Sequence, residues 1–221
     1  FICASDTPAI ANFTNIILPM EDEEIALLTP LGIEIYDSNN ERQYRNPVSL
    51  KVSEQIIDKM DFKHYMLKEI YDQPGTAKNW LENYLIKNLE SGKYQISYPF
   101  DTNFFESIER VEIIACGTSK HAAMVGSFLL EQFSGIPTNV FFASEFRYSP
   151  PPLLPNTLTI GVTQSGETAD TIAAIDMEIK RRSSIEDKKF KPNLIAITNR
   201  KESSIGRQVS NIIDICAGIE V

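Results

Sequence analysis

Two short stretches of the chain gather hydroxyl side chains around a glycine. Cys116–Ser119 reads Cys-Gly-Thr-Ser, and Thr163–Thr168 reads Thr-Gln-Ser-Gly-Glu-Thr. A helical pattern follows each stretch at once, and the first N–H groups of a helix have no partners within it. With the helix dipole, such donors suit an anion with several oxygens, such as a phosphate monoester. The two stretches therefore predict a phosphate or phosphosugar site whose hydroxyls add donors without adding charge.

Each hydroxyl-rich stretch follows an apolar run that is typical of a buried strand. Five such runs alternate with helical patterns, at residues 111–116, 139–144, 157–163, 193–198 and 212–217. Continuous apolar strands separated by helices favour a parallel sheet that is covered on both faces. We therefore predict an α/β fold with a five-stranded, mostly parallel sheet and helices on both faces. In such sheets ligands bind beyond the carboxyl ends of the strands, where both stretches lie.

Apolar residues at helical spacing indicate the helices between these strands. Three helices are expected, at residues 119–135, at residues 168–182 and, as a short helix, at residues 203–210. The apolar residues that share one face are Val125, Phe128, Leu129 and Phe133 in the first helix, and Ile172, Ile175 and Ile179 in the second.

The first sixty residues have a different pattern. Apolar runs at residues 15–20, 24–29 and 32–38 are separated by turn residues, and Ser38–Arg42 has the composition of a tight turn. These runs predict adjacent antiparallel strands. Sixty residues are few for an independent core, so we interpret this segment as part of a larger domain.

A helical pattern then extends from Phe62 to about Leu89. Pro74 is predicted to end a first helix, and Thr76 to cap the start of a second helix that ends at Gly92. Residues 93–105 are expected to form an irregular connector.

The composition argues against several classes of protein. A net charge of −9 argues against nucleic acid as a partner. No apolar run approaches the roughly 18 residues of a membrane span, and no signal peptide is expected. The three cysteines and two histidines have no ligand spacing, so we expect reduced thiols, a cytoplasmic location and no metal site. The basic stretch Lys180–Lys191 is interpreted as a solvated helix end, with a polyanion contact as the alternative.

Other readings of the hydroxyl-rich stretches stay open. Their hydroxyls could serve only as helix caps, which is common for Ser and Thr. A Ser165–His121 pair is conceivable, although His121 is expected on a helix surface. There is no GxGxxG, GxxxxGK[ST] or GxSxG pattern, so dinucleotide, P-loop and nucleophile-elbow sites are not indicated. Glu167 and Asp170 lie close to the proposed anion, so both must point away or pair with a cation.

Four motifs resemble one enzyme family. ACGTS (115–119), ASEFRY (143–148), QSGETADT (164–171) and HYMLKEIYDQP (64–74) resemble glutamine–fructose-6-phosphate amidotransferase (isomerising), which makes glucosamine 6-phosphate. The resemblance spans essentially the whole chain. It implies that residues 1–65 are the C-terminal part of a glutaminase domain, residues 66–103 a helical linker, and residues 104–221 the first sugar isomerase (SIS) domain.

The resemblance also implies which residues bind the sugar phosphate. They are Thr118, Ser119, Thr163, Gln164, Ser165 and Thr168, with the backbone of Cys116 and Gly117 adjacent. Thr163 stands where most of the family has Ser. No catalytic residue is expected in this chain, because the glutaminase nucleophile and the isomerase's catalytic glutamate, histidine and lysine lie in parts it lacks. The chain alone is therefore expected to be inactive.

The resemblance implies no metal or organic cofactor. The expected partners are fructose 6-phosphate or glucosamine 6-phosphate, glutamine only through the glutaminase part, and further copies of the protein through the isomerase part. Neither nucleic acid nor a membrane is expected. The alternative is a non-catalytic SIS module that senses a phosphosugar, which the N-terminal strands and the 64–74 motif disfavour.

Overall fold

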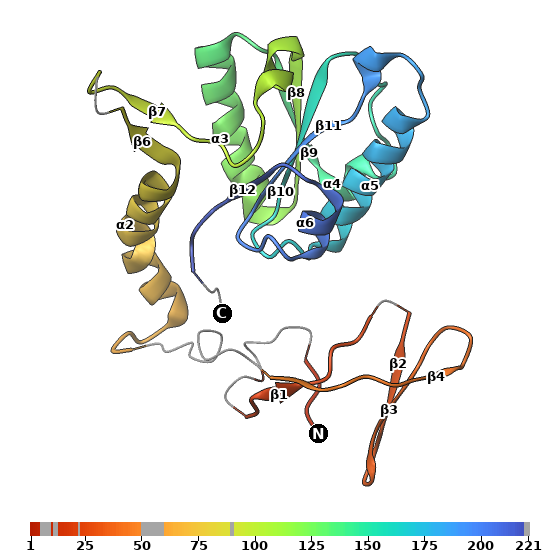
Figure 1. Ribbon diagram of the computed structural model, residues 1–221. Coiled ribbons are helices and arrows are strands. Elements are labelled where there is room, and N and C mark those ends of the chain that lie inside the picture. Colours follow the sequence, from red (N-terminus) through yellow and green to blue (C-terminus); the bar gives the residue numbers. More distant parts are fainter. Residues whose placement is uncertain (5–9, 11–12, 22, 50–59, 89–90, 219–221) are drawn as a thin grey trace. The chain divides into compact units, whose positions relative to one another are not determined.

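The computed structural model describes residues 1–4, 10, 13–21, 23–49, 60–88 and 91–218 (Figure 1). These residues form two compact units, residues 1–71 and residues 72–218. The finer division into residues 1–65, 66–103 and 104–221 stays a prediction. No helix in the described ranges is both long and apolar enough to cross a membrane.

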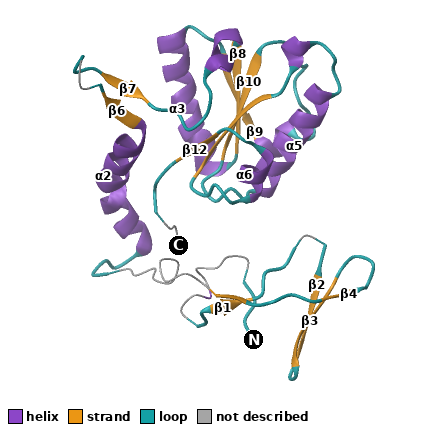
Figure 2. Cartoon of the chain, in the orientation of Figure 1, coloured by secondary structure: helices purple, strands orange, loops and turns teal. Residues whose placement is uncertain are grey.

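The N-terminal unit contains short antiparallel strands, as predicted (Figure 2). β2 (Ile25–Thr29), β3 (Gly32–Tyr36) and β4 (Arg42–Gln43) form one sheet, and β1 (Ile16–Ile17) pairs with β5 (Val48–Ser49). The Asp37 carboxylate accepts the N–H groups of Asn39 and Glu41 and so closes the predicted turn. Ile35 is buried, whereas Ile25 and Leu31 are exposed. β1 is shorter than the run that predicted it.

The helical pattern after residue 62 forms one helix, α2 (Tyr65–Tyr84), with Pro74 inside it. The prediction of two helices separated at Pro74 was therefore wrong. Proline removes one helical hydrogen bond, to the carbonyl of Ile70. The side chains of Ile70 and Tyr71 on that turn are exposed, so water has access to the turn that loses the bond.

The residues after α2 form a hairpin instead of a helix end and an irregular connector. β6 (Leu85–Lys87) pairs antiparallel with β7 (Tyr94–Ile96). The Gly92 N–H donates to the carbonyl of Asn88, and Gly92 has φ of +67°, which favours glycine. Pairing between the two strands thus overrides the helical pattern that predicted a helix up to Gly92.

The second unit is built on a five-stranded sheet. Its strands are β8 (Arg110–Ala115), β9 (Thr138–Phe142), β10 (Thr157–Val162), β11 (Asn193–Thr198) and β12 (Ile212–Asp214). The order is β12-β11-β10-β8-β9, and every neighbouring pair is parallel. The predicted α/β fold is confirmed. The strand predicted at residues 139–144 ends at Phe142, because α4 (Ala143–Phe146) turns back so that Ala143 and Phe146 are buried.

Helices cover both faces of this sheet (Figure 1). α3 (Gly117–Ser134) and the short 3₁₀ helix at Asn103–Ser107 lie on one face, over Val111, Ile113 and Ile160. α4, α5 (Ala169–Ser183) and α6 (Ser204–Gln208) lie on the other face. A second 3₁₀ helix, Lys188–Phe190, precedes β11. The helices predicted from apolar spacing are therefore present.

The apolar face that predicted α3 does not point into the core. Val125, Phe128, Leu129 and Phe133 are 63%, 74%, 47% and 80% exposed. The inward side of α3 packs through Ala123 and the partly buried Leu130. The periodicity indicated the helix correctly, but its apolar face is a surface of the second unit.

The C-terminal half of α5 carries a buried ionic cluster. Arg182 and Glu178 have fully buried side chains joined by a 2.6 Å ion pair, and Glu112 of β8 lies 3.8 Å from Arg182. Arg181 pairs with Glu178 at 3.0 Å. The interpretation of Lys180–Lys191 as a solvated stretch was therefore wrong for Arg182. Its guanidinium lies on the buried stripe of α5 because Glu178, one turn earlier, neutralises it.

Candidate functional site

The two hydroxyl-rich stretches lie at the same edge of the sheet. β8 and β10 are parallel neighbours, and Ala115 at the end of β8 pairs with Val162 at the end of β10. Cys116–Ser119 therefore leaves the carboxyl end of one strand, and Thr163–Thr168 leaves the carboxyl end of the next. This edge is where an open α/β sheet binds its ligands.

The first stretch opens the 18-residue helix α3. Cys116 is the N-cap residue with extended backbone, and its side chain makes no capping hydrogen bond. The Lys120 N–H bonds to the carbonyl of Cys116, so the N–H groups of the three residues before Lys120 precede the helical ladder. Gly117 has φ of +52°, and Thr118 is exposed. Cys116 itself packs against the core through its thiol, as expected for a partly buried cysteine.

The second stretch opens the 15-residue helix α5. Thr168 is the N-cap residue, yet its hydroxyl makes no capping hydrogen bond. It lies instead 2.8 Å from the hydroxyl of Thr163, which is buried. The Ser165 hydroxyl accepts the Glu167 N–H at 3.2 Å. Neither N-cap side chain, that of Cys116 or that of Thr168, bonds to its own helix, so the N-cap positions lend no support to the reading that these hydroxyls only cap helices.

The acidic residues Glu167, in the second stretch, and Asp170, in the first turn of α5, are both engaged. Asp170 Oδ1 lies 2.7 Å from Arg147 Nη1, and this hydrogen bond raises the pKa of Arg147 above its ordinary value. Glu167 Oε1 accepts the Ser204 N–H at 2.9 Å. Asp170 thus pairs with a cation, as expected. The Glu167 carboxylate binds a backbone N–H instead, which is neither of the two expected arrangements.

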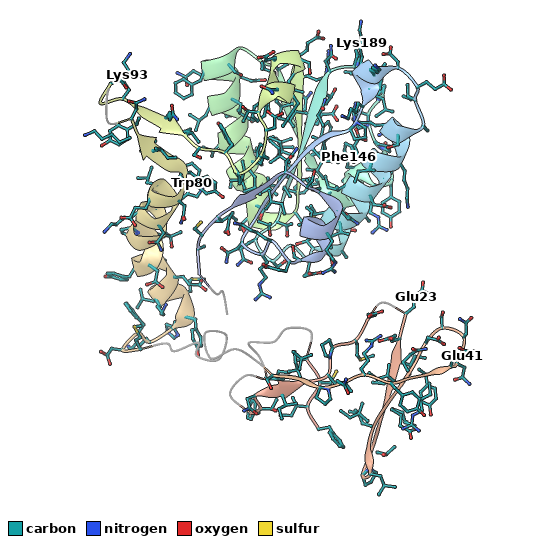
Figure 3. The ribbon with its side chains drawn as sticks, viewed as in Figure 1. Glu23, Glu41, Trp80, Lys93, Phe146 and Lys189 are labelled. Carbon is teal, nitrogen blue, oxygen red and sulfur yellow. The ribbon has the colours of Figure 1, made fainter. Side chains whose placement is uncertain are left out.

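Arg147 is a residue of this edge that sequence reasoning missed. It follows α4, whose last residue, Phe146, is labelled in Figure 3. The Phe146 ring anchors α4 by packing on the Phe141 ring, with the two ring centroids 5.3 Å apart. The ASEFRY motif contains Arg147, but nothing in the sequence indicates that Asp170, 23 residues later, is its partner.

The loop after β11 also supports the second stretch, and sequence reasoning did not include it. The Gln164 carbonyl accepts the Asn199 N–H at 3.0 Å and the Thr198 hydroxyl at 3.3 Å. The side chain of Asn199 in turn accepts the Ala217 N–H at 2.8 Å. The loops of three neighbouring strands are therefore joined at this edge.

His121 is exposed on α3, as predicted, while the Ser165 hydroxyl is engaged by a backbone N–H. Among the hydrogen bonds of the described residues none joins Ser165 to His121, so the pairing of the two as nucleophile and base has no support. Among the described residues, no group of three or more His, Cys, Asp or Glu side chains is placed to hold a metal ion. What this edge offers chemically is a set of neutral hydroxyls and helix N–H donors, which suits an anionic ligand.

Comparison with known proteins connects this edge to one family. The family model described as "SIS domain" matches residues 104–221. Over its whole length the chain is 51% identical to "Glutamine--fructose-6-phosphate aminotransferase [isomerizing]" of Thermosynechococcus vestitus, of which it spans 36%. It is 37% identical to the protein of the same name from Clostridium acetobutylicum, with 99% of the chain and 34% of that protein aligned.

A solved structure has the same fold. The C-terminal domain of glucosamine-fructose-6-phosphate aminotransferase from Francisella tularensis superposes with a TM-score of 0.64 and 30% identity. The superposition covers 75% of this chain and 43% of that one. The chain thus spans about a third of the length of the curated relatives it matches.

Proposed function

The chain belongs to the SIS domain family, and from this premise we propose that it is part of an enzyme that makes glucosamine 6-phosphate from fructose 6-phosphate and glutamine. Within that enzyme, the proposal assigns to this chain the loops that hold the sugar phosphate. The 51% identity over the whole chain to an aminotransferase of this name supports it.

One observation carries the binding role. Two helices of 18 and 15 residues begin at the ends of neighbouring parallel strands, and neither start is capped by its own side chain. Each helix start carries about half a positive charge and several N–H donors without partners in the helix. Two such starts at one sheet edge, surrounded by hydroxyls, fit the several oxygens of a phosphate dianion.

The eight residues of the site take different parts in this proposal. Donors come from the hydroxyls of Thr118, Ser119, Ser165 and Thr168, from the side-chain amide of Gln164, and from the backbone at Cys116 and Gly117. Thr163 acts through Thr168, since the two hydroxyls are 2.8 Å apart and Thr163 is buried. The Thr163 hydroxyl then fixes the direction in which Thr168 presents its own.

No described residue is assigned a catalytic role. In the proposed reaction, glutamine is hydrolysed to glutamate and ammonia, the ammonia replaces the C2 oxygen of fructose 6-phosphate, which leaves as water, and the resulting imine isomerises to the 2-amino aldose. The contribution of this chain is to bind and orient the phosphate end of the sugar, so the chain alone is expected to be inactive.

The test is a titration of the 15N-labelled chain with fructose 6-phosphate. The amide signals of Gly117 and Gly166 are expected to shift with saturation at millimolar ligand or below. Inorganic phosphate is expected to shift the same signals at higher concentration, and fructose without phosphate is expected to leave them in place. Unchanged amide signals at these two glycines up to millimolar fructose 6-phosphate would contradict the proposal.

The alternative is a SIS module that senses a phosphosugar without catalysis. The identity to aminotransferases extends over all of this chain, including the residues before the SIS domain at residue 104. A sensor that shared only the SIS domain would not require similarity in those first hundred residues. This extent of the similarity favours the enzyme.

The proposal also includes the association of identical copies of this protein. The exposed face of α3 formed by Val125, Phe128, Leu129 and Phe133 is the kind of apolar patch that marks an interface. We propose that a further copy covers it. Phe128→Glu is expected to reduce the mass measured by sedimentation, whereas Tyr94→Glu, at an exposed aromatic on β7, is expected to leave it unchanged.

A cytoplasmic location is also part of the proposal. Cys3, Cys116 and Cys216 are all free thiols, which suits a reducing compartment.

A further inference from the structure

The carboxylate of Glu167 is an electrostatic problem for the proposed site. Glu167 lies between Ser165 and Thr168, in the loop whose hydroxyls are proposed to contact a phosphate dianion. A formal negative charge in this loop opposes the binding of a dianion. Removing it would therefore strengthen binding, unless Glu167 contributes something that outweighs the repulsion.

The contacts of Glu167 show what that contribution is. Its Oε1 accepts the N–H of Ser204, the first residue of α6, at 2.9 Å. The carbonyl of the preceding residue, Gly166, accepts the N–H of Ile205 at 3.1 Å. Two consecutive residues of the loop thus each bind one N–H of the first turn of α6. Ile205 is fully buried, so the loop is tied to the core of the second unit.

The same loop packs against α6 without any spare space. A Cβ atom on Gly166 would lie 1.9 Å from Ser203 Oγ and 2.4 Å from Ser203 Cβ. Gly166 also has φ of +71°, a conformation that residues with a side chain rarely adopt. Hydrogen bonds and close packing therefore hold the loop at one distance from the N-terminus of α6.

Glu167 also orients a proposed ligand group directly. Its N–H donates to the Ser165 hydroxyl at 3.2 Å. That bond occupies a lone pair of the oxygen and leaves the O–H of Ser165 free to donate elsewhere. The backbone at Glu167 thus sets the donor direction of Ser165, and the side chain of Glu167 holds that backbone in place.

We infer that Glu167 is a positioning residue of the sugar-phosphate site, whose carboxylate fixes the Thr163–Thr168 loop on α6 and so directs the loop's donors at the phosphate. The inference rests on the proposed function. It assigns to Glu167 no contact with the ligand; its charge is tolerated because a carboxylate is a strong acceptor for the Ser204 N–H.

The variant Glu167→Ala separates positioning from electrostatics, because for it the two predict changes of the Kd in opposite directions. Glu167→Gln keeps an oxygen acceptor of the same reach and removes the charge, so the 221-residue chain is expected to bind fructose 6-phosphate at least as tightly. Glu167→Ala removes both and is expected to raise the Kd about tenfold, the size of one charge-assisted hydrogen bond. Electrostatics alone would lower the Kd in both variants.

Substitutions at Ser204 test the same bond from the other side. Ser204→Pro removes the N–H at the first helical position, where proline is well tolerated, and Ser203 already has the extended backbone (ψ 173°) that a following proline requires. The matched control Ser204→Ala keeps the N–H and loses only the hydroxyl, which accepts from Arg207. Ser204→Pro is expected to weaken binding about tenfold, and Ser204→Ala to leave it unchanged.

The double variant Glu167→Ala/Ser204→Pro is expected to bind no more weakly than either single variant, within about twofold, because both remove one bond. Glu186→Ala, which removes an exposed carboxylate far along the chain, controls for net charge. Thermal unfolding of each variant separates loss of fold from loss of binding. If Glu167→Ala does not fold, the comparison of Ser204→Pro with Ser204→Ala tests the positioning role by itself.

These experiments distinguish failure of the positioning role of Glu167 from failure of the proposed function. If the unaltered chain binds no fructose 6-phosphate, the proposed function fails, and this inference fails with it. If it binds, but Glu167→Ala binds as tightly or more tightly, or Ser204→Pro binds like Ser204→Ala, only the positioning role is overturned. Effects that multiply in the double variant would likewise overturn it.

Discussion

Arg147 Nη1 lies 2.7 Å from Asp170 Oδ1, and this pair joins the residue after α4 to the first turn of α5. An aspartate in the first turn of a helix competes with an anion for the same dipole and the same N–H groups. Arg147 draws the carboxylate towards α4. Arg147 thus engages the Asp170 carboxylate in the first turn of α5, where the proposed anion would bind.

This ion pair predicts opposite effects of its two members. Asp170→Asn removes a negative charge near the phosphate and frees Arg147, so the affinity for fructose 6-phosphate is expected to rise about threefold. Arg147→Ala frees the Asp170 carboxylate and is expected to lower the affinity about fivefold, within the range of partly exposed ion pairs. Isothermal titration at low and high salt measures both. The combined variant should return close to the original affinity; a combined loss equal to that of Arg147→Ala would contradict this role for Asp170.

The Thr163–Thr168 hydroxyl pair gives a second prediction. Thr163→Val keeps the shape of the buried side chain and removes its hydroxyl, so Thr168 loses the partner 2.8 Å away. Affinity for fructose 6-phosphate is expected to fall about fivefold, as for one neutral hydrogen bond. Thr163→Ser keeps the hydroxyl and is expected to keep the affinity, with about 1 kcal/mol lost from the free energy of unfolding for the missing methyl. Equal affinities for the Val and Ser variants would show that the hydroxyl has no role.

Gly166→Ala gives a prediction about stability. The new Cβ would meet Ser203 Oγ at 1.9 Å, and the backbone φ of +71° adds strain of its own. The free energy of unfolding in urea is expected to fall by at least about 2 kcal/mol. Adding Ser203→Gly removes the clash but not the strain, so part of the loss should return. If the single variant is as stable as the original chain, the close packing of the loop on α6 is not present in solution.

The buried cluster on α5 predicts a pH dependence. Burial, followed by the negative charge of Glu178, raises the pKa of Glu112 above its ordinary value. Because the folded-state pKa exceeds the unfolded one of about 4.3, ionisation of Glu112 lowers stability as the pH rises from that value through the folded-state pKa. Glu112→Gln is therefore expected to stabilise the chain at pH 7, on the order of 1 kcal/mol, and to make little difference at pH 4.

A matched variant completes this test. Glu178→Gln keeps an oxygen acceptor for Arg182 but removes the buried negative charge that pairs with it at 2.6 Å, and is expected to lower the free energy of unfolding by about 3 kcal/mol at pH 7. Urea unfolding of both variants at pH 4 and pH 7 gives the comparison. Destabilisation by Glu112→Gln at pH 7 would mean that its attraction to Arg182 outweighs the burial of its charge.

The sequence determined the fold class and indicated the sheet edge at which the site is proposed. Apolar runs such as 193–198 became strands, because a strand buried on both faces requires an unbroken apolar stretch and little else has that pattern. Glycine and hydroxyl residues at 116–119 and 163–168 marked the helix starts at the carboxyl edge of the sheet. A helix start can be predicted from sequence because the residues that form it are neighbours in the chain.

Only the tertiary structure decided how the site is supported. The partners of Asp170 and Glu167 are 23 and 37 residues distant, and no local pattern indicates which residues the sheet order will bring together. The errors at Pro74 and at the β6–β7 hairpin have other causes. Helix α2 continues through the proline on an exposed turn, and pairing of Leu85–Lys87 with Tyr94–Ile96 replaces the predicted helix end. The sequence likewise showed that α3 has an apolar face. Which side of the helix packs on the sheet, and therefore whether that face is exposed, was decided by the tertiary structure. Local preferences are worth tenths of a kcal/mol per residue, whereas burial and long-range pairing are worth more, so the latter prevail where they conflict.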